Sequence, residues 1–227
     1  MPASGAVTRN TLRQQIADAL RDEVLAGRLL PGQEFTVKQI AEQYGVSATP
    51  VREALVDLSA QDLLDSDQHR GFRVHQFSIA DFRDMVEARS LIVDSVFRKL
   101  EGEHLAGRAH GAALVSVRRR AEESARAARG GDLNVLIGYD LRFWREFGAL
   151  VANRYVADFL HRLRVQAWVF SVPFLREDTE GGKWLWSGHE RVVDALTLGD
   201  AAAARAVIGE YDDHSLEWAD RLERSQR

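Results

Sequence analysis

Cysteine is absent from the 227 residues of the chain. This absence excludes a disulfide framework, catalysis by a thiolate, and zinc or iron–sulfur sites with cysteine ligands. Long apolar runs are absent as well, because no stretch approaches the roughly 18 residues that a membrane-spanning helix needs. The first ten residues also lack the apolar core of a signal peptide. We therefore expect a cytoplasmic protein that has no membrane partner.

Proline is scarce, with only Pro2, Pro31, Pro50 and Pro173 in the chain. The proline-free stretch between the last two predicts long helices, since proline is the strongest helix breaker. Hydrophobic residues make up 45% and charged residues 28%, which is typical of a globular protein. The net charge of −4 neither requires nor excludes nucleic-acid binding, because a DNA-binding face needs only a few well-placed cations.

The first third of the chain predicts short helices separated by glycine. An apolar stripe at every fourth position marks a helix that ends near Gly27. The stripe consists of Leu12, Ile16, Leu20 and Val24. A second helix begins after Thr36, where Gln39 completes a capping box, and ends at Gly45. This spacing predicts the first helix of a helix-turn-helix pair.

The second helix of that pair starts at Ser47 or Thr49, with Pro50 in its first turn, where a missing N–H costs little. Residues 63–77 then alternate around a polar tip, which predicts a two-stranded hairpin or wing. We therefore predict a winged helix-turn-helix DNA-binding domain over residues 1–76.

Residues 77–227 predict a second domain, a bundle of about six helices for effector binding and dimerisation. Apolar residues recur there at spacings of three and four, and glycine or proline marks the breaks. The expected helices are Ile79–Leu105, Ala109–Arg129, Leu133–Ala152, Arg154–Phe170, Trp184–Leu198 and Ala201–Glu223. The fold class is thus mostly α, with a small β-hairpin in the first domain.

Two sets of motifs resemble a known family. The sequences AGRLLPGQEF at 26–35 and GVSATPVREAL at 45–55 closely resemble the winged-helix signature of GntR-type bacterial transcription regulators. EAR at 87–89, DLRFW at 140–144 and GHE at 188–190 resemble the FCD effector-binding domain of the FadR branch. The resemblance implies a cytoplasmic homodimer that binds a palindromic double-stranded DNA operator and responds to a small-molecule effector.

For the first domain, the resemblance implies DNA contacts from the start of the second helix of the pair, from the helix before it, and from the wing. The candidate residues are Arg9, Thr36, Lys38, Ser47, Ala48, Thr49, Arg52, Arg70 and Gly71. Arg52 is the candidate for reading guanine, because a guanidinium bonds O6 and N7 together. Ala48 departs from the family, in which many members carry arginine, so the operator sequence cannot be carried over.

For the second domain, the resemblance implies an effector site inside the bundle. Its candidate residues are Arg89, Asp140, Trp144, Asn153, His189 and His214. Metal-binding relatives use an aspartate and three histidines, of which Asp140, His189 and His214 are matched. Trp144 replaces the remaining histidine. The three ligands suit zinc, manganese or nickel.

Two readings of this site stay open. In one, a divalent metal with an open position binds a carboxylate effector, and Arg89 neutralises its charge. In the other, Trp144 fills the pocket and the remaining residues bind an apolar or aromatic ligand directly. No organic cofactor is expected.

The leading hypothesis is a ligand-responsive regulator, most often a repressor in this family. Alternatives are a metal-free acyl-CoA sensor and, with little support, a metal-dependent hydrolase. The hydrolase has no catalytic motif in the sequence, so we do not expect an enzyme.

Overall fold

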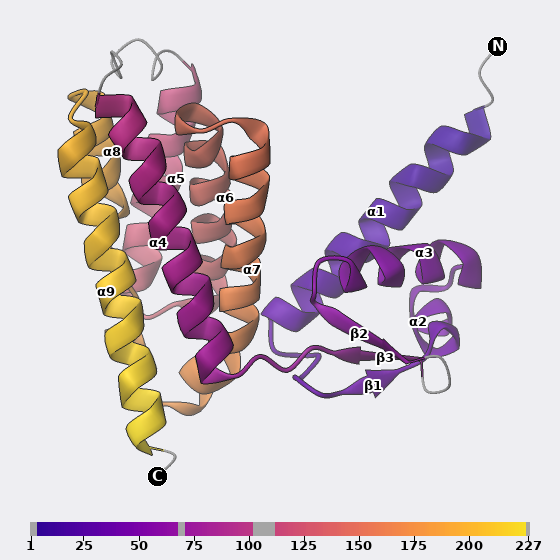
Figure 1. Cartoon of the computed structure of the whole chain (residues 1–227). Coiled ribbons are helices and arrows are strands. Elements are labelled where there is room, and N and C mark those ends of the chain that lie inside the picture. The colour runs from indigo at the N-terminus through magenta and orange to yellow at the C-terminus, as the bar shows by residue number, and fades with distance from the viewer. Residues whose placement is uncertain (1–3, 68–70, 102–111, 226–227) are drawn as a thin grey trace. The chain divides into compact units, whose positions relative to one another are not determined.

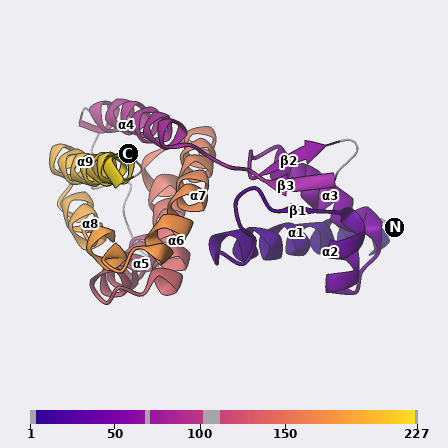
Figure 2. The same ribbon diagram turned by 90° about the horizontal axis from the view of Figure 1, so that it is seen from below.

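A computed structural model describes residues 4–67, 71–101 and 112–225, with side chains from residue 12 onward. It divides the chain into two compact units. The first comprises Met1–Phe77 with Val169–Pro173, and the second comprises Ser78–Trp168 with Phe174–Arg227. Figures 1 and 2 show the helices and strands of both units.

Three helices of the first unit are the predicted ones. They are α1 (Ser4–Leu25), α2 (Val37–Tyr44) and α3 (Ala48–Ser59). Both α1 and α2 pack against α3. Leu20 on α1 and Leu55 on α3 are completely buried, as the apolar spacing predicts. The helix-turn-helix arrangement is therefore confirmed.

A small antiparallel sheet completes the first unit. The predicted hairpin consists of β2 (Leu64–Asp67) and β3 (Gly71–Val74). A third strand, β1 (Glu34–Phe35), adds to the other side of β3, so the strand order is β1-β3-β2. The sequence did not predict β1, because two residues are too few to show the alternation that marks a strand.

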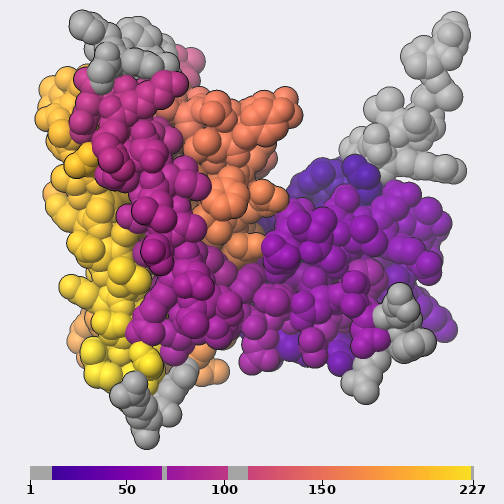
Figure 3. Space-filling model, viewed as in Figure 1, coloured from indigo at the N-terminus to yellow at the C-terminus, as the bar shows by residue number. Residues whose placement is uncertain are grey.

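The described residues of the second unit form helices and no strand, as predicted. Its helices are α4 (Ile79–Glu101), α5 (Ala112–Arg129), α6 (Leu133–Val151), α7 (Arg154–Glu177), α8 (His189–Thr197) and α9 (Ala201–Ser225). In Figure 3, α4 and α9 run side by side along the visible face of this unit, in agreement with their many close approaches. The predicted helix ends at residues 105 and 109 lie outside the described residues.

One predicted end was wrong. Helix α7 does not stop at Phe170 but continues through Pro173 to Glu177. A proline inside a helix costs about 3 kcal/mol. Burial of Val172, which is 0% exposed, and of Leu175, which is 9% exposed, offsets this cost on either side of the proline.

One predicted start was also wrong. The chain forms a short 3₁₀ turn, η2 (Gly181–Trp184), and α8 starts only at His189, not at Trp184. The indole of Trp186 folds back over Gly188, where a Cβ would lie 2.3 Å from the ring. This packing holds the chain out of a helix until His189.

The core of the second unit is aromatic and aliphatic. Phe97, Phe143 and Phe147 stack on one another, with ring centroids 5.7 to 6.3 Å apart. Leu196 and Ile208 close the same cluster and are each 1% exposed. Trp144 joins it with 5% exposure, so the side chain that replaces a family histidine is part of the core.

Candidate functional site

The turn between α2 and α3 is fixed by backbone geometry. Thr36 and Gln39 form the predicted capping box, in which Gln39 N donates to Thr36 Oγ1 at 3.2 Å and Thr36 N donates to Gln39 Oε1 at 2.7 Å. Gly45 ends α2 in the left-handed region with φ of 64°. A glycine is favoured there because it has no Cβ to clash. The turn places the first residues of α3 on the surface.

Arg52 presents a free guanidinium on that surface. Its side chain is exposed one turn into α3. Within the described residues it has neither an ion pair nor a hydrogen bond. Asp57, a carboxylate on the same helix, pairs with Arg13 at 3.2 Å. All five N–H donors of Arg52 are therefore available to a ligand.

The two hydroxyl residues next to the turn differ in how they are used. Ser47 is the N-cap residue of α3, yet its side chain makes no capping hydrogen bond. Thr36 Oγ1, in contrast, both accepts from Gln39 N and donates to Gln39 Oε1 at 3.0 Å. Thr49 is exposed in the first turn of α3. Ser47 and Thr49 are thus free to meet a phosphate, whereas Thr36 is committed to the cap.

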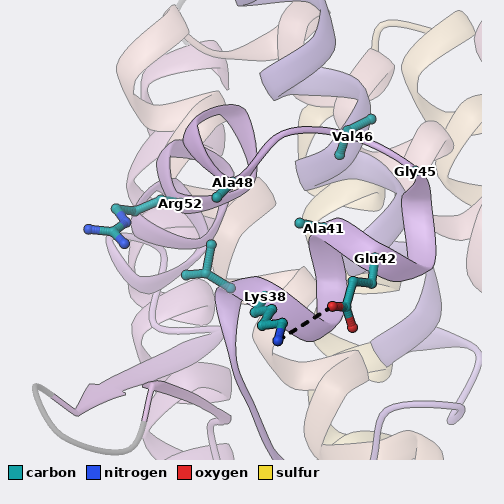
Figure 4. Close-up of a pocket in the computed structure, with 8 residues that line it drawn as sticks. Lys38, Ala41, Glu42, Gly45, Val46, Ala48 and Arg52 are labelled. Carbon is teal, nitrogen blue, oxygen red and sulfur yellow. Dashed lines mark ion pairs between the residues drawn. The ribbon is translucent and has the colours of Figure 1, made fainter.

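Figure 4 shows the shallow pocket between α2 and α3. It is lined by Lys38 and Glu42 from α2 and by Ala48 and Arg52 from α3. Lys38 Nζ lies 3.8 Å from Glu42 Oε1, and both side chains are largely exposed. An exposed pair of this kind is worth little, so Lys38 can exchange its partner for a phosphate. Arg52 extends away from this pair.

Gly71, in the predicted wing, is required by the packing of the sheet. Gly71 has φ of 99°, and a Cβ at this position would lie 2.7 Å from the carbonyl oxygen of Phe35. The close approach of β1 to β3 therefore requires glycine. Arg70 and the side chain of Arg9, both predicted to contact DNA, lie outside the described residues.

Inside the second unit, the predicted effector residue Arg89 is already paired. Its side chain is 2% exposed. Arg89 Nε donates to Asp212 Oδ1 at 2.8 Å, and Nη2 lies 2.5 Å from the same oxygen without hydrogen-bond geometry. Tyr211 lies 4.5 Å from the guanidinium carbon of Arg89. The pair satisfies the charge that we expected to meet an effector.

Asp140 accepts three hydrogen bonds in the same interior. Trp144 Nε1 donates to Oδ1 at 2.9 Å, and Trp168 Nε1 donates to Oδ2 at 2.7 Å. His189 Nε2 lies 2.8 Å from Oδ1 and carries the shared proton, since a carboxylate only accepts. Burial alone would raise the pKa of Asp140, but His189 and the nearby charge of Arg164 outweigh it, and the pKa lies below its ordinary value.

The remaining predicted effector residues lie elsewhere. His214 Nε2 lies 2.9 Å from the carbonyl oxygen of Trp184, away from Asp140. Asn153 caps α7, accepting from Tyr155 N at 3.0 Å and Val156 N at 3.1 Å. Asp140, His189 and Trp144 are thus brought together, whereas Asn153 and His214 are not.

The arrangement does not fit the expected metal. Both oxygens of Asp140 are occupied by N–H donors, and His189 turns Nε2 toward Asp140 and not toward an open position. Across residues 4–67, 71–101 and 112–225, no three histidine, aspartate or glutamate side chains gather as a metal site. The indole of Trp144 supplies a hydrogen-bond donor where metal-binding relatives carry a ligand.

Both parts of the chain match known domain families. Residues 12–74 match the gntR family of bacterial regulatory proteins, and residues 99–213 match the FCD domain. The chain belongs to the GntR family. It is a transcriptional regulator and not an enzyme, so the hydrolase alternative is wrong.

Several relatives of this GntR regulator are informative. A probable D-xylose utilization operon transcriptional repressor of Paenarthrobacter nicotinovorans is 30% identical over 205 residues, covering 90% of this chain and 87% of that protein. The regulator McbR of Escherichia coli is 36% identical over 74 residues, 33% of this chain and 34% of its own. The solved structure of E. coli McbR/YncC has a TM-score of 0.77 at 20% identity, covering 93% of this chain and 98% of that one. That structure supports the fold alone. No described helix of this regulator is long and apolar enough to cross a membrane.

Sequence reasoning missed three residues of the GntR regulator's interior, one of which is Asp212, the partner of Arg89. Arg164 on α7 is 4% exposed, and its guanidinium carbon lies 3.6 Å from the ring centroid of Trp144. Tyr211 on α9 stacks on Trp144 at 5.7 Å. The helical spacing of Arg164 from Leu160 and Trp168, four residues to either side, was the available signal that it faces inward. We call Arg89, Asp140, Arg164, His189, Tyr211 and Asp212 the buried polar cluster.

Proposed function

We propose that this GntR regulator is a repressor that binds a palindromic operator as a homodimer and is controlled by a small molecule bound in its helical unit. The observation that carries the DNA-binding part is the free, exposed guanidinium of Arg52 at the start of α3. In a helix-turn-helix, side chains at this position reach base edges in the major groove.

The neighbouring residues support a phosphate-binding role around Arg52. Ser47 has an uncommitted hydroxyl, Thr49 is exposed, and Lys38 is held only by an exposed ion pair. Phosphate contacts position a protein on DNA, whereas base contacts specify the sequence. We therefore assign base reading to Arg52 and positioning to Ser47, Thr49 and Lys38.

The homodimer follows from the size of the DNA-binding unit. A single module of this kind buries about 600 to 1,000 Å² of protein surface on DNA, which gives modest affinity. Two modules related by a two-fold axis bind two half-sites of opposite direction, which is a palindrome. The name of the Paenarthrobacter relative, an operon repressor, supports repression as the direction of control.

The small cavity beside Trp144 favours a small effector over the acyl-CoA alternative, because a small guest needs less movement of the cavity wall. The space beside Trp144 leaves only about 20 Å³ for the centres of water-sized molecules. An acyl chain would need a far larger tunnel. D-xylose is one candidate to test, because the Paenarthrobacter relative is named for its utilization operon.

The test is a selection of bound fragments from the host genome by the full-length protein, followed by affinity measurements on the recovered site. We expect one palindromic motif, bound by two chains per site in light scattering. Arg52→Ala should lose affinity for this motif, whereas Arg142→Ala, which changes an exposed arginine of α6, should not. Unrelated, non-palindromic fragments or equal affinities for both variants would contradict the proposal.

A further inference from the structure

Arg164 is a buried charge whose hydrogen bonding is incomplete. The side chain is 4% exposed, and its Nη1 is buried without a hydrogen-bond partner in the part of the chain that the structure describes. Burying a charge without a partner costs free energy, so such groups are rare in interiors. A buried donor of this kind needs an explanation, and a bound anion is one that suits a guanidinium.

Asp140 and Asp212 attract the charge of Arg164, but neither carboxylate makes a hydrogen bond or ion pair with it. Asp140 accepts from Trp144, Trp168 and His189, and Asp212 is paired with Arg89. Trp144 covers a face of the guanidinium at 3.6 Å, and the ring of Tyr211 lies at 5.5 Å. Stacking of this type stabilises the charge but leaves the in-plane N–H donors unused.

The charge is present at neutral pH. Burial, and after it the charge of Arg89, lowers the pKa of Arg164 to about 10. Both effects disfavour the charged form. An anion hydrogen-bonded to Arg164 would oppose both effects, as Asp140 and Asp212 do in part from a distance.

Arg164 also lines a cavity whose other walls are apolar. These walls include Val93, Phe97, Phe147, Leu160 and Ile208. The free space of about 20 Å³ admits the centre of a single water, although a stably bound water needs two to four polar partners. A guest larger than one water therefore requires side chains of the cavity wall to move.

We propose that Arg164 anchors the carboxylate of the effector, and that the effector is a small monocarboxylate whose apolar body lies against Val93, Phe97 and Leu160. The planar guanidinium matches a carboxylate through two parallel hydrogen bonds. This inference rests on the proposed function, in which the helical unit binds a small molecule. It moves the anchoring role from Arg89, which Asp212 already neutralises, to Arg164.

The first test needs no ligand. Arg164→Met keeps the unbranched apolar stem and removes the charge. We expect the thermal midpoint of ligand-free protein to stay equal or rise, because the desolvation cost that is removed offsets the lost attraction to Asp140 and Asp212. Arg162→Met, at an exposed arginine of the same helix, is the matched control and should leave the midpoint unchanged. A fall of many degrees in Arg164→Met alone would show that the charge serves the fold, and would overturn the proposal.

The second test uses butyrate and benzoate, with butyramide, benzamide and inorganic phosphate as comparison probes. We expect the carboxylates to raise the thermal midpoint of the full-length wild type and to change the fluorescence of its five tryptophans. The uncharged amides should do neither, and Arg164→Met should lose the response that Arg162→Met keeps. Equal responses to acid and amide, equal responses in both variants, or no response to either acid would overturn the proposal.

Two further outcomes distinguish failure of the ligand class, of the Arg164 anchor and of the proposed function. A stronger, Arg164-dependent response to phosphate than to carboxylate would overturn the ligand class. Operator binding by wild type and Arg164→Met should be the same without ligand. If neither protein binds any operator, the proposed function fails, whereas intact operator binding with no Arg164-dependent carboxylate response removes the anchor alone.

Discussion

The two units of this regulator hold their charged side chains in opposite ways. On the first unit, Arg52 and Lys38 are exposed to solvent. Lys38 has only a weak ion pair with Glu42, and Arg52 has no partner within the described residues. In the second, Arg89 and Asp140 are buried with partners at 2.7 to 2.9 Å. Charges left free at a surface are available to phosphates and bases, whereas charges paired in an interior fix the shape of the bundle.

Arg164 differs from both groups, since it is as buried as Arg89 but makes no hydrogen bond or ion pair within the described residues. We therefore predict that substitution of an exposed, weakly paired charge alters DNA affinity, whereas substitution of a buried, paired charge alters stability. Without a ligand, a change of Arg164 should leave DNA affinity unchanged and should not lower stability. Substitutions in both units therefore test whether exposed and buried charges have these different roles.

The largest effect is expected from Asp140→Asn. The change removes the charge that faces His189 and presents an amide N–H to the indole donors of Trp144 and Trp168. Breaking a buried pair in this way costs about 3 to 5 kcal/mol. Chemical denaturation at pH 7 should show a loss of this size in the unfolding free energy.

The matched control is Asp158→Asn, at an exposed aspartate of α7, which should change the unfolding free energy by less than about 0.5 kcal/mol. If the two variants lose the same stability, Asp140 does not organise the interior.

The same carboxylate predicts a pH dependence. The pKa of Asp140 in the folded protein lies below its ordinary value of 3.8, although burial opposes this, because His189 stabilises the charged form. The unfolded state therefore binds the proton first as the pH falls. The stabilisation is fully present above the ordinary value and is lost as the pH drops through the lower, folded value.

The stability difference between wild type and Asp140→Asn should thus be constant from pH 7 to about pH 5 and shrink below about pH 4. Thermal unfolding of both proteins across this range measures it. A difference that grows as the pH falls would mean that the pKa is raised and not lowered.

On the first unit, Arg52→Ala should weaken binding to the selected operator by about 1 to 3 kcal/mol, or roughly 5- to 150-fold. Fluorescence anisotropy at fixed salt measures this loss. The thermal midpoint should stay unchanged, because the guanidinium has no partner within the described residues. A loss of stability with unchanged affinity would mean that Arg52 serves the fold, as Arg89 and Asp140 do.

The smallest effects distinguish the two hydroxyl residues. Thr36→Ala removes a capping box, so it should cost about 1 kcal/mol of stability. Ser47→Ala removes a hydroxyl that makes no capping bond, so it should leave stability unchanged and weaken DNA binding about equally for all sequences. Denaturation and anisotropy measure both quantities on the two variants. A stability loss in Ser47→Ala, with a loss of DNA affinity but not of stability in Thr36→Ala, would contradict this account.

Much of the fold could be predicted from local signals. The capping box at Thr36 and Gln39, the helix end at Gly45 and the apolar stripe on α1 are all local, and the structure confirms each of them. Where prediction was wrong, distant contacts outweighed a local rule. Helix α7 passes Pro173 because its flanks are buried, and Trp186 keeps the segment before His189 out of a helix.

The candidate site was less predictable because its members come from different helices. Asp140 and His189 were found through their resemblance to a family pattern, and they do lie together. Tyr211 and not His214 is the α9 residue at the cluster, one helical turn earlier, since the packing of α9 decides which face is buried. Arg164 carries no motif, and only the burial of its donor reveals it.

The measurement that tests the account most directly is the affinity of the full-length protein for its selected operator, with and without a saturating small carboxylate, in wild type and Arg164→Met. The account predicts that the carboxylate weakens operator binding by wild type about 5-fold or more, a usual size for such coupling, and leaves Arg164→Met unchanged. An equal change in both proteins, or no change in either, would contradict it.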